Sequence, residues 1–271
     1  MDRQVVSPPF AYYGGKTTLA PQIAALLPPH VHYVEPFAGG LSVLLAKPRS
    51  EAETVNDLDG DLVTFWRVLR DQPEDLERVC RLTPHSREDY AQSSDLNAPD
   101  LERARRVWVR LTQSRSNSMK PTGWRRSLDG QRSLPRIMAR HAESIARVAT
   151  RLDGVTLESR DALAVIREYG VESDVCLYVD PPYLGSTRAT NYRVEMTADD
   201  AHVALANALN ECKASVVLSG YDAPLYAELF DGWHRVAIKA PPAMSHETGR
   251  VEVLWSNRPL GEPDLFSEAS A

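Results

Sequence analysis

The sequence predicts an α/β fold, with a mixed seven-stranded sheet, helices on both of its faces and an inserted, mostly helical subdomain. Short apolar runs that end at polar, glycine or proline residues predict the strands. Apolar residues at helical spacing separate several of these runs, and such βαβ alternation predicts a largely parallel sheet. We expect the strands at residues 31–34, 54–55, 155–157, 175–179, 215–218, 236–238 and 251–255.

Two helical patterns between the strands are the clearest. Leu62, Phe65, Trp66 and Leu69 recur every three to four residues, and residues 203–209 show similar spacing. The last two strands are joined by a turn-rich stretch that is too short for a crossover helix. We therefore expect them to form an antiparallel pair at the edge of the sheet.

The alternation stops between about residues 71 and 151. Helical runs at 103–111 and 137–152 flank a polar loop at 112–133. We interpret residues 71–151 as an insertion into a main domain that comprises residues 1–70 and 152–260. Residues 261–271 are expected to form a flexible tail.

Basic residues concentrate in this insertion, although the 271-residue chain has a formal net charge of −6. Residues 101–151 hold 13 Lys and Arg against 3 Asp and Glu, whereas the rest of the chain holds 18 against 34. A local basic patch is the electrostatic signature of phosphate binding, whatever the total charge. The alternative is a solvated, arginine-rich helical face.

The composition argues against several classes of protein. No segment approaches the roughly 20 apolar residues that span a bilayer, and the N-terminus lacks the apolar part of a secretory signal. The three cysteines and seven histidines show no metal-ligand spacing, so we expect neither disulfides nor a metal site. A cytoplasmic protein without a membrane partner is predicted.

The most informative motif is Asp180-Pro181-Pro182-Tyr183, which directly follows the apolar run 175–179. Two consecutive prolines cannot donate ladder hydrogen bonds, so the strand ends at the carboxylate. In open α/β sheets, ligands bind beyond the carboxyl ends of the strands. A carboxylate, free carbonyls and an aromatic ring at that place can hold a flat, amino-bearing ring.

A glycine turn follows the first predicted strand and consists of Glu35, Pro36, Phe37, Ala38, Gly39 and Gly40. It either lets a ligand approach the backbone near a helix N-terminus or is a purely structural turn. About 20 residues further on, Asp57 follows the next strand, where an acidic residue commonly accepts ribose hydroxyls. Asp57 could instead cap the following helix, a role that Asp59 could also fill.

Two other segments carry candidate ligand contacts. Tyr12-Tyr13-Gly14-Gly15-Lys16-Thr17 only superficially resembles a phosphate-binding loop, because Phe10 stands where that loop needs glycine. Its lysine and aromatic residues could instead meet a carboxylate and a flat ring. Asp161 follows the strand 155–157 and either accepts from a ligand amino group or caps the next helix, and the residues alone slightly favour capping.

Taken in this order, the motifs resemble the Dam-like family of DNA adenine-N6 methyltransferases, the D12 class, in its alpha-type arrangement with the target-recognition region before the Asp-Pro-Pro-Tyr motif. The resemblance covers about residues 8–257. It implies a Rossmann-like S-adenosylmethionine-dependent methyltransferase fold, in which the main domain is catalytic and the insertion recognises DNA. The chain departs from the family pattern F-x-G-x-G at Leu41, so the path of the glycine turn is not implied.

The resemblance also implies S-adenosylmethionine as the cofactor and double-stranded DNA as the substrate. By position, Tyr12 takes the place of a family tryptophan, Lys16 matches a cofactor-contacting lysine and Asp57 matches the residue that binds the ribose. The expected cofactor-binding residues are Tyr12, Gly14, Gly15, Lys16, Glu35, Pro36, Phe37, Gly39, Gly40, Asp57, Asp161 and Asp180.

Asp180, Pro181, Pro182 and Tyr183 are the expected catalytic residues. An adenine must leave the duplex before its N6 amine can be reached. We expect Tyr183 to stack on the flipped base while Asp180 and the Pro181 carbonyl accept the two N6 hydrogens. These bonds would aim the nitrogen lone pair at the sulfonium methyl group.

The basic insertion is expected to contact phosphates or guanine bases, and the sequence does not sort its arginines between these roles. Trp124 either wedges into the duplex or packs the loop. The expected DNA-binding residues are Arg103, Arg106, Arg110, Arg115, Lys120, Trp124, Arg125, Arg126 and Arg132.

Other functions remain open from the sequence. They are N4 methylation of cytosine, N6 methylation of adenine in RNA, and a DNA-binding protein that is non-catalytic or that uses ATP through residues 15–17. The intact motif at residues 180–183 favours catalysis. We expect a monomer in a bacterial or phage-infected cell, and the recognition sequence and a restriction endonuclease partner remain open.

Overall fold

The computed structural model describes residues 6–126, 133–183, 199–238 and 252–261. Within these ranges, seven strands form one sheet in the order β3-β2-β1-β4-β5-β7-β6. Their bounds are β1 (His32–Glu35), β2 (Ala52–Asn56), β3 (Thr156–Glu158), β4 (Val175–Val179), β5 (Ser215–Tyr221), β6 (His234–Ile238) and β7 (Glu252–Ser256).

The directions of the strands agree with the sequence prediction. β3, β2, β1, β4 and β5 are parallel, whereas β7 runs antiparallel to both β5 and β6. The α/β class, the mixed sheet and the antiparallel pair at its edge are therefore confirmed. The expected tail begins at Gly261, and its residues 262–271 lie outside the described part of the chain.

Alternate residues of each central strand point to opposite faces of the sheet, and each face is covered by helices. Tyr33, Cys176 and Val217 pack on one face, and Leu177 and Val216 pack on the other. The first face is covered by α1 (Ala20–Leu26), α2 (Ser42–Ala46) and α3 (Gly60–Asp71), and the second by α9 (Ala162–Tyr169), α10 (Asp199–Asn210) and α11 (Pro224–Leu229).

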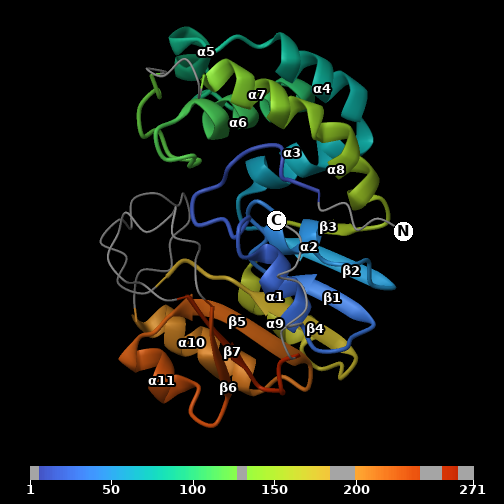
Figure 1. The fold of residues 1–271 in the computed structure, drawn as a ribbon, viewed down its shortest axis with the longest axis vertical. Coiled ribbons are helices and arrows are strands. Elements are labelled where there is room, and N and C mark those ends of the chain that lie inside the picture. The colour runs from blue at the N-terminus through green and yellow to red at the C-terminus, as the bar shows by residue number, and fades with distance from the viewer. Residues whose placement is uncertain (1–5, 127–132, 184–198, 239–251, 262–271) are drawn as a thin grey trace, which may run out of the picture.

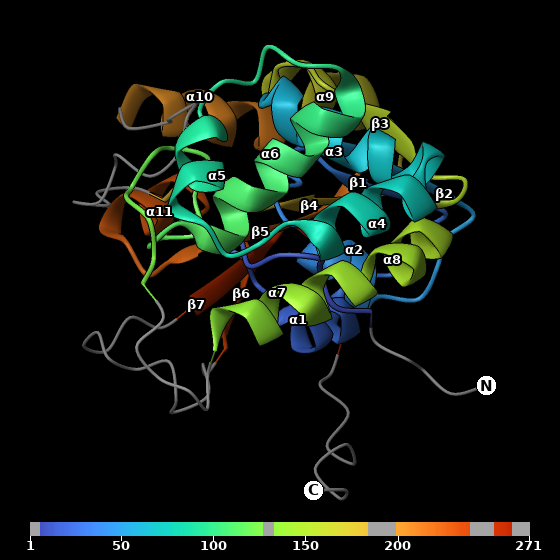
Figure 2. The same cartoon turned by 90° about the horizontal axis from the view of Figure 1, so that it is seen from above.

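In the described residues between α3 and β3, five helices form the upper part of the molecule in Figure 1. Figure 2, which looks down on them, shows that they cover the strands from above. Trp108 and Met138 belong to the same hydrophobic cluster as Tyr33 of the sheet, so this helical group shares a core with the strands. The helices are α4 (Pro73–Leu82), α5 (Arg87–Gln92), α6 (Asp100–Gln113), α7 (Leu134–Glu143) and α8 (Ile145–Leu152).

None of the helices in the described ranges is long and apolar enough to cross a membrane.

Candidate active site

Four carboxylates stand at the carboxyl ends of four neighbouring parallel strands. Asp161 follows β3, Asp57 follows β2, Glu35 ends β1 and Asp180 follows β4. From β1 the chain continues to β2 on one side of the sheet, and from β4 it continues to β5 on the other side. Glu35 and Asp180 therefore flank the point where the strand order reverses. A crevice forms at such a point because the connections diverge to opposite faces.

A cavity of ≈ 260 Å³ lies at this edge of the sheet. All twelve residues that the sequence predicted at the cofactor line it, and so does Pro182. Pro181 and Tyr183 do not line it. Tyr178 of β4 lines the cavity as well and was missed, because it was interpreted only as part of an apolar strand.

The glycine turn is shaped by Tyr12. Gly39 has a φ of +47°, and a Cβ on it would lie 3.0 Å from the Tyr12 ring. A Cβ on Gly40 would lie 3.0 Å from Cβ of Tyr12. Leu41 has a φ of 56° and ψ of 26°, which is the left-handed conformation that glycine adopts without cost. Leu41 therefore keeps a glycine-like backbone where the family pattern has glycine, while its side chain is fully buried.

Asp59 caps α3, since its side chain accepts hydrogen bonds from the amides of Asp61 and Leu62. Asp57 instead accepts from the amide of Gly39 at 2.9 Å and from that of Asp59 at 2.8 Å. Asp57 thus joins the glycine turn to the end of β2 and faces the cavity. Asp161 caps α9 through the amide of Ala164 at 3.1 Å and also lines the cavity, so both of its predicted roles are compatible with the structure.

Lys16 and Asp180 form a buried ion pair beside the cavity. The Lys16 ammonium donates to both Asp180 oxygens at 2.9 Å and to the carbonyl of Gly14 at 3.1 Å. Burial alone would lower the pKa of Lys16, but the nearby charges of Asp180 and Glu252 outweigh burial and raise it. Burial raises the pKa of Asp180, an effect that Lys16 opposes. Lys16 is thereby held as a cation against the carboxylate.

Tyr183 contacts Lys16 of this pair but does not line the cavity. Its ring centroid is 4.7 Å from the Lys16 ammonium, and its hydroxyl donates to Glu252 Oε1 at 2.5 Å. Glu252 was not predicted as a site residue. The signal that could have identified it is an acidic residue within the otherwise apolar run 251–255, which was expected to form a buried strand.

Glu35 is fully enclosed at the end of β1. Its Oε1 accepts from the Tyr33 hydroxyl at 2.6 Å and from the amide of Leu44 at 2.8 Å. Burial raises the pKa of Glu35 from its ordinary 4.5 to about 7, although these two hydrogen bonds oppose the shift. The carboxyl group therefore changes charge within the physiological range.

We expect the Glu35→Gln substitution to flatten the pH dependence of folding stability. Because folding raises the pKa of Glu35, this group stabilises the fold fully below about pH 4.5, and the contribution is lost as the pH rises to about 7. The loss is on the order of 3 kcal/mol, whereas glutamine can keep both hydrogen bonds without titrating. Denaturant unfolding at pH 5 and pH 8 measures the difference, and equal pH dependence in both proteins would contradict the expectation.

Several arginines of the insertion have partners inside the protein. The Arg103 guanidinium bonds Asp61, Arg106 bonds Glu102 at 2.8 Å, and buried Arg110 donates to the carbonyl of Met119 at 3.0 Å. The Arg103 contact joins α6 to α3 and the Arg110 contact joins it to the following loop, whereas the Arg106 contact lies within α6. All three residues were expected to contact DNA, and that expectation stays a prediction.

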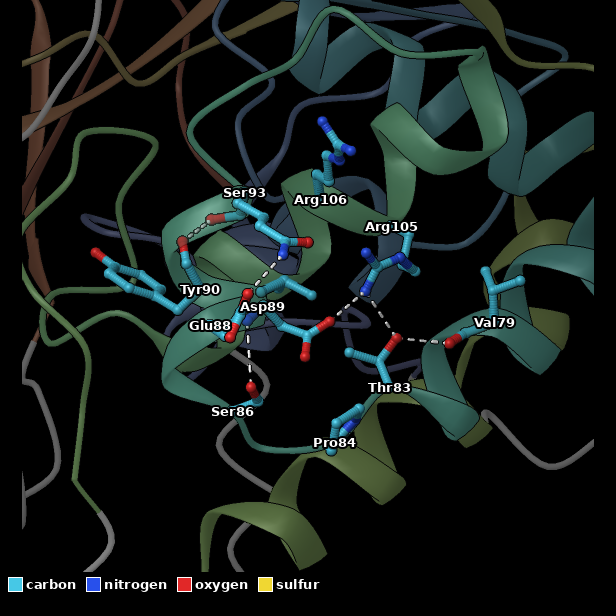
Figure 3. Close-up of polar contacts among 12 residues, drawn as sticks. Val79, Thr83, Pro84, Ser86, Glu88, Asp89, Tyr90, Ser93, Arg105 and Arg106 are labelled. Carbon is cyan, nitrogen blue, oxygen red and sulfur yellow. Dashed lines mark hydrogen bonds and ion pairs between the residues drawn. The ribbon is translucent and has the colours of Figure 1, made fainter.

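Arg105, which was not among the expected DNA contacts, is engaged in the same way. It reaches Asp89 at 3.0 Å and Thr83 at 3.2 Å, as Figure 3 shows. It also pairs with Glu102 within α6. The bond to Asp89 therefore holds α5 against α6, and the bond to Thr83 holds the end of α4.

The 114–126 loop presents exposed basic residues. Backbone bonds from Arg115 to Gly123 at 3.0 Å and from Arg125 to Gln113 at 2.8 Å close it like a hairpin. Arg115, Arg125 and Arg126 are exposed, and Lys120 is half-buried. Arg132 lies outside the described residues.

Trp124 packs within this loop. Its ring stacks on His85 with centroids 4.5 Å apart and an interplanar angle of 16°, and the guanidinium carbon of Arg87 lies 4.7 Å from its centroid. His85 and Arg87 were missed because they lie far from Trp124 in the sequence, as the His85 contact with the Arg125 carbonyl, 40 residues away, illustrates. Trp124 thus packs against its neighbours in the described structure, and its predicted role as a wedge in the duplex stays a prediction.

The loop is tied to the N-terminal segment. The amide of Tyr13 donates to the carbonyl of Asn117 at 2.9 Å, and the indole of Trp108 in α6 donates to the carbonyl of Pro9 at 2.9 Å. Residues 9–16 therefore lie between the helical group and the cavity and contact both.

Comparison with known proteins agrees with this arrangement. Residues 12–244 match the model of a family described as D12 class N6 adenine-specific DNA methyltransferase. The chain is also similar to the Type II methyltransferase M1.LlaDCHI of Lactococcus lactis subsp. cremoris. The two are 27% identical over 270 residues, which cover 90% of this chain and 93% of that protein.

Proposed function

Because the chain belongs to the D12 class N6 adenine-specific DNA methyltransferase family, we propose that its cavity binds S-adenosylmethionine and that residues 180–183 direct methyl transfer to an adenine turned out of the duplex. Methylation of adenine in DNA follows from the family. The observation that carries the residue assignment is the position of Asp180, at the end of β4 and on the wall of the cavity. The alternatives of cytosine, RNA and ATP chemistry have no comparable support.

The residues of the cavity fit this cofactor. S-adenosylmethionine carries hydroxyl groups on its ribose, a flat adenine and positive charges on its sulfur and amino groups. Asp57, Asp161 and Glu35 supply carboxylate oxygens, and Tyr12 and Phe37 supply aromatic surface. When bound, the cofactor supplies an electrophilic methyl group.

Asp180 acts on the adenine amine in this proposal. A carboxylate offers about four lone-pair sites, so the two bonds from Lys16 leave acceptor sites for an N6 hydrogen. The Pro181 carbonyl accepts a hydrogen bond from the second N6 hydrogen, and the Tyr183 ring stacks on the base. Orientation and fixed charges supply the catalysis.

The helical group between α3 and β3 is proposed to recognise the DNA. Among its exposed basic residues, those of the 114–126 loop lie next to the N-terminal segment that lines the cavity. We therefore assign phosphate or base contacts to Arg115, Arg125 and Arg126. Arg103, Arg106 and Arg110 are omitted from this proposal because their contacts lie within the protein.

Neutralising Arg125 and Arg126 together with glutamine is expected to flatten the salt dependence of DNA binding. Each phosphate contact that is lost lowers the slope of log K against log[salt] by about 1, so a change of about 2 is expected. Arg67→Gln is the matched control, since Arg67 of α3 is half-exposed but is paired with Asp100 at the start of α6. Fluorescence anisotropy from 50 to 300 mM salt measures the slopes, and an unchanged slope in the double variant would favour a solvated face.

The reaction itself is tested by its product. The purified protein is incubated with S-adenosylmethionine and, in separate reactions, duplex DNA or RNA. The nucleic acid is then digested to nucleosides that are identified by mass. N6-methyladenine is expected. Methylated cytosine or RNA-only activity would overturn the assignment of the substrate, and cofactor binding without any product would overturn the proposed catalytic role.

The cellular setting is part of the proposal. An asymmetric helical group can read a short site without a second copy, so we propose that the protein acts as a monomer. The similarity to a Type II methyltransferase supports a restriction-modification setting with an endonuclease partner. Such a protein would act on DNA in the cytoplasm of a bacterial or phage-infected cell.

A further inference from the structure

A polar cluster around Glu252 lies behind Tyr183. Glu252 begins β7 and is 8% exposed, and its Oε1 accepts from the Tyr183 hydroxyl and from the Ser219 hydroxyl, both at 2.5 Å. The Lys16 ammonium lies 3.9 Å from the same oxygen. Glu252 does not line the cofactor cavity, so its effect on the reaction must pass through these neighbours.

A carboxylate at this position is costly for the fold. Val253, Leu254 and Trp255, which follow it in β7, are almost completely buried, and a charge in such surroundings is tolerated only when it is paired and hydrogen-bonded. An apolar residue would suit the start of this strand better. The presence of glutamate is therefore explained by its three polar neighbours rather than by packing.

The contacts of Glu252 fix the orientation of the Tyr183 ring. The hydroxyl at the far end of the ring is held by Glu252, and the ring meets Tyr221 edge-on with centroids 4.4 Å apart. At the near end, the backbone follows two prolines, whose φ angles are fixed. A ring that is held at both ends is a rigid surface for stacking.

Glu252 also acts on the charge of Asp180. The two carboxylates share Lys16, which bonds Asp180 and lies near Glu252. Burial is the largest cause of the raised pKa of Asp180, and the charge of Glu252 raises it further against the opposing effect of Lys16. Removal of that charge therefore lets Asp180 ionise at a lower pH.

We propose that Glu252 is a positioning residue for methyl transfer, which holds the Tyr183 ring where the extruded adenine stacks and shares the Lys16 ammonium with Asp180. The proposal rests on the function proposed above. It extends that function to a strand and a residue that neither the family match nor the Asp-Pro-Pro-Tyr motif points to.

Three variants separate the effect of Glu252 on the orientation of the Tyr183 ring from its effect on the charge of Asp180. Glu252→Ala frees the Tyr183 hydroxyl, Tyr183→Phe removes the same bond from the other side, and Glu252→Gln keeps an acceptor oxygen but removes the charge. We expect a loss of about 10²-fold in single-turnover rate for Glu252→Ala, because a misplaced stacking surface misplaces the amine. The double variant with Tyr183→Phe is expected to be no slower than Glu252→Ala, since both remove one interaction.

Glu252→Gln is expected to recover most of the rate, with the acid limb of its pH profile shifted to lower pH. The second readout is 2-aminopurine fluorescence at the target adenine, placed after the methylated site of the wild type has been mapped. Glu252→Ala should alter the stacked state of the extruded base, whereas binding of S-adenosylmethionine alone should be retained. Glu53→Gln is the matched control, because Glu53 is equally buried but bonds Lys47 and Arg151 away from the cavity.

Glu53→Gln is expected to lower stability and to keep the wild-type rate per folded molecule. A wild-type rate for Glu252→Ala, or multiplicative losses in the double variant, would overturn the inference. If Glu252→Ala does not fold, the pH profile of Glu252→Gln tests the inference. An acid limb at the same pH as in the wild type would then overturn the inference. Absence of methylation by the wild type would instead refute the proposed function, so the two failures are distinguishable.

Discussion

Replacement of Asp180 by alanine is expected to lower the single-turnover rate of methyl transfer by about 10³-fold, with the protein still folded. The substitution removes the acceptor that orients the adenine amine. The fold should persist because Asp180 is a buried carboxylate with a raised pKa, and because Lys16 keeps its bond to the Gly14 carbonyl and its proximity to Glu252. Rapid-quench assays with saturating cofactor and DNA measure the rate, and circular dichroism checks the fold.

The control for this substitution is Asp231→Ala, which removes an exposed carboxylate in the turn after α11. It should leave both the rate and the melting temperature unchanged. Turnover of Asp180→Ala within about tenfold of the wild type would place the chemistry elsewhere, since the loss of a group that contacts the reacting amine costs at least 10²-fold.

Replacement of Arg151 by methionine is expected to lower the free energy of unfolding by about 3 to 5 kcal/mol. Arg151 of α8 donates to both oxygens of Glu53 in β2, at 2.5 and 2.9 Å, and to the carbonyl of Leu44 in α2. Both side chains are buried. Methionine fills similar space but leaves the Glu53 carboxylate with Lys47 as its remaining cation. Urea unfolding followed by circular dichroism measures the change.

Two further variants help to interpret the loss of stability in Arg151→Met. Arg160→Met breaks an exposed contact with Glu158 and Glu168 and should cost far less stability than Arg151→Met, because exposed ion pairs contribute little. Addition of Glu53→Gln to Arg151→Met should recover part of the stability, because the unpaired charge disappears. A loss for Arg151→Met as small as that for Arg160→Met would show that this contact does not hold α8 on the sheet.

Local periodicity explains why the architecture can be predicted from the sequence. All seven strands and the helix at α3 coincide with apolar runs that have the expected spacing. Two of the bounds differ at buried polar residues. β2 extends back to Ala52 because Glu53 is neutralised by partners from distant segments, and the run 137–152 divides at Ser144, whose hydroxyl bonds the His141 carbonyl.

The residues expected at the cofactor line one cavity because the carboxyl ends of parallel strands meet at one edge, whatever the length of the connections. Their contact with a cofactor stays a prediction. Partners across the fold were not predictable in this way. The count of basic residues in the insertion did not include Asp61, which precedes the insertion in the sequence. Asp61 pairs with Arg103 and so neutralises one of the counted charges. Glu252 was missed for the same reason, since Tyr183 and Ser219 are 69 and 33 residues away.

The backbone contact between Tyr13 and Asn117 physically connects the two proposed binding regions. Tyr13 lies on the wall of the cavity, and Asn117 belongs to the 114–126 loop, so one hydrogen bond joins segments proposed to hold different ligands. If a ligand on either side shifts this contact, it changes affinity on the other side. Reciprocity then requires that DNA strengthens or weakens cofactor binding by the same factor by which the cofactor changes DNA binding.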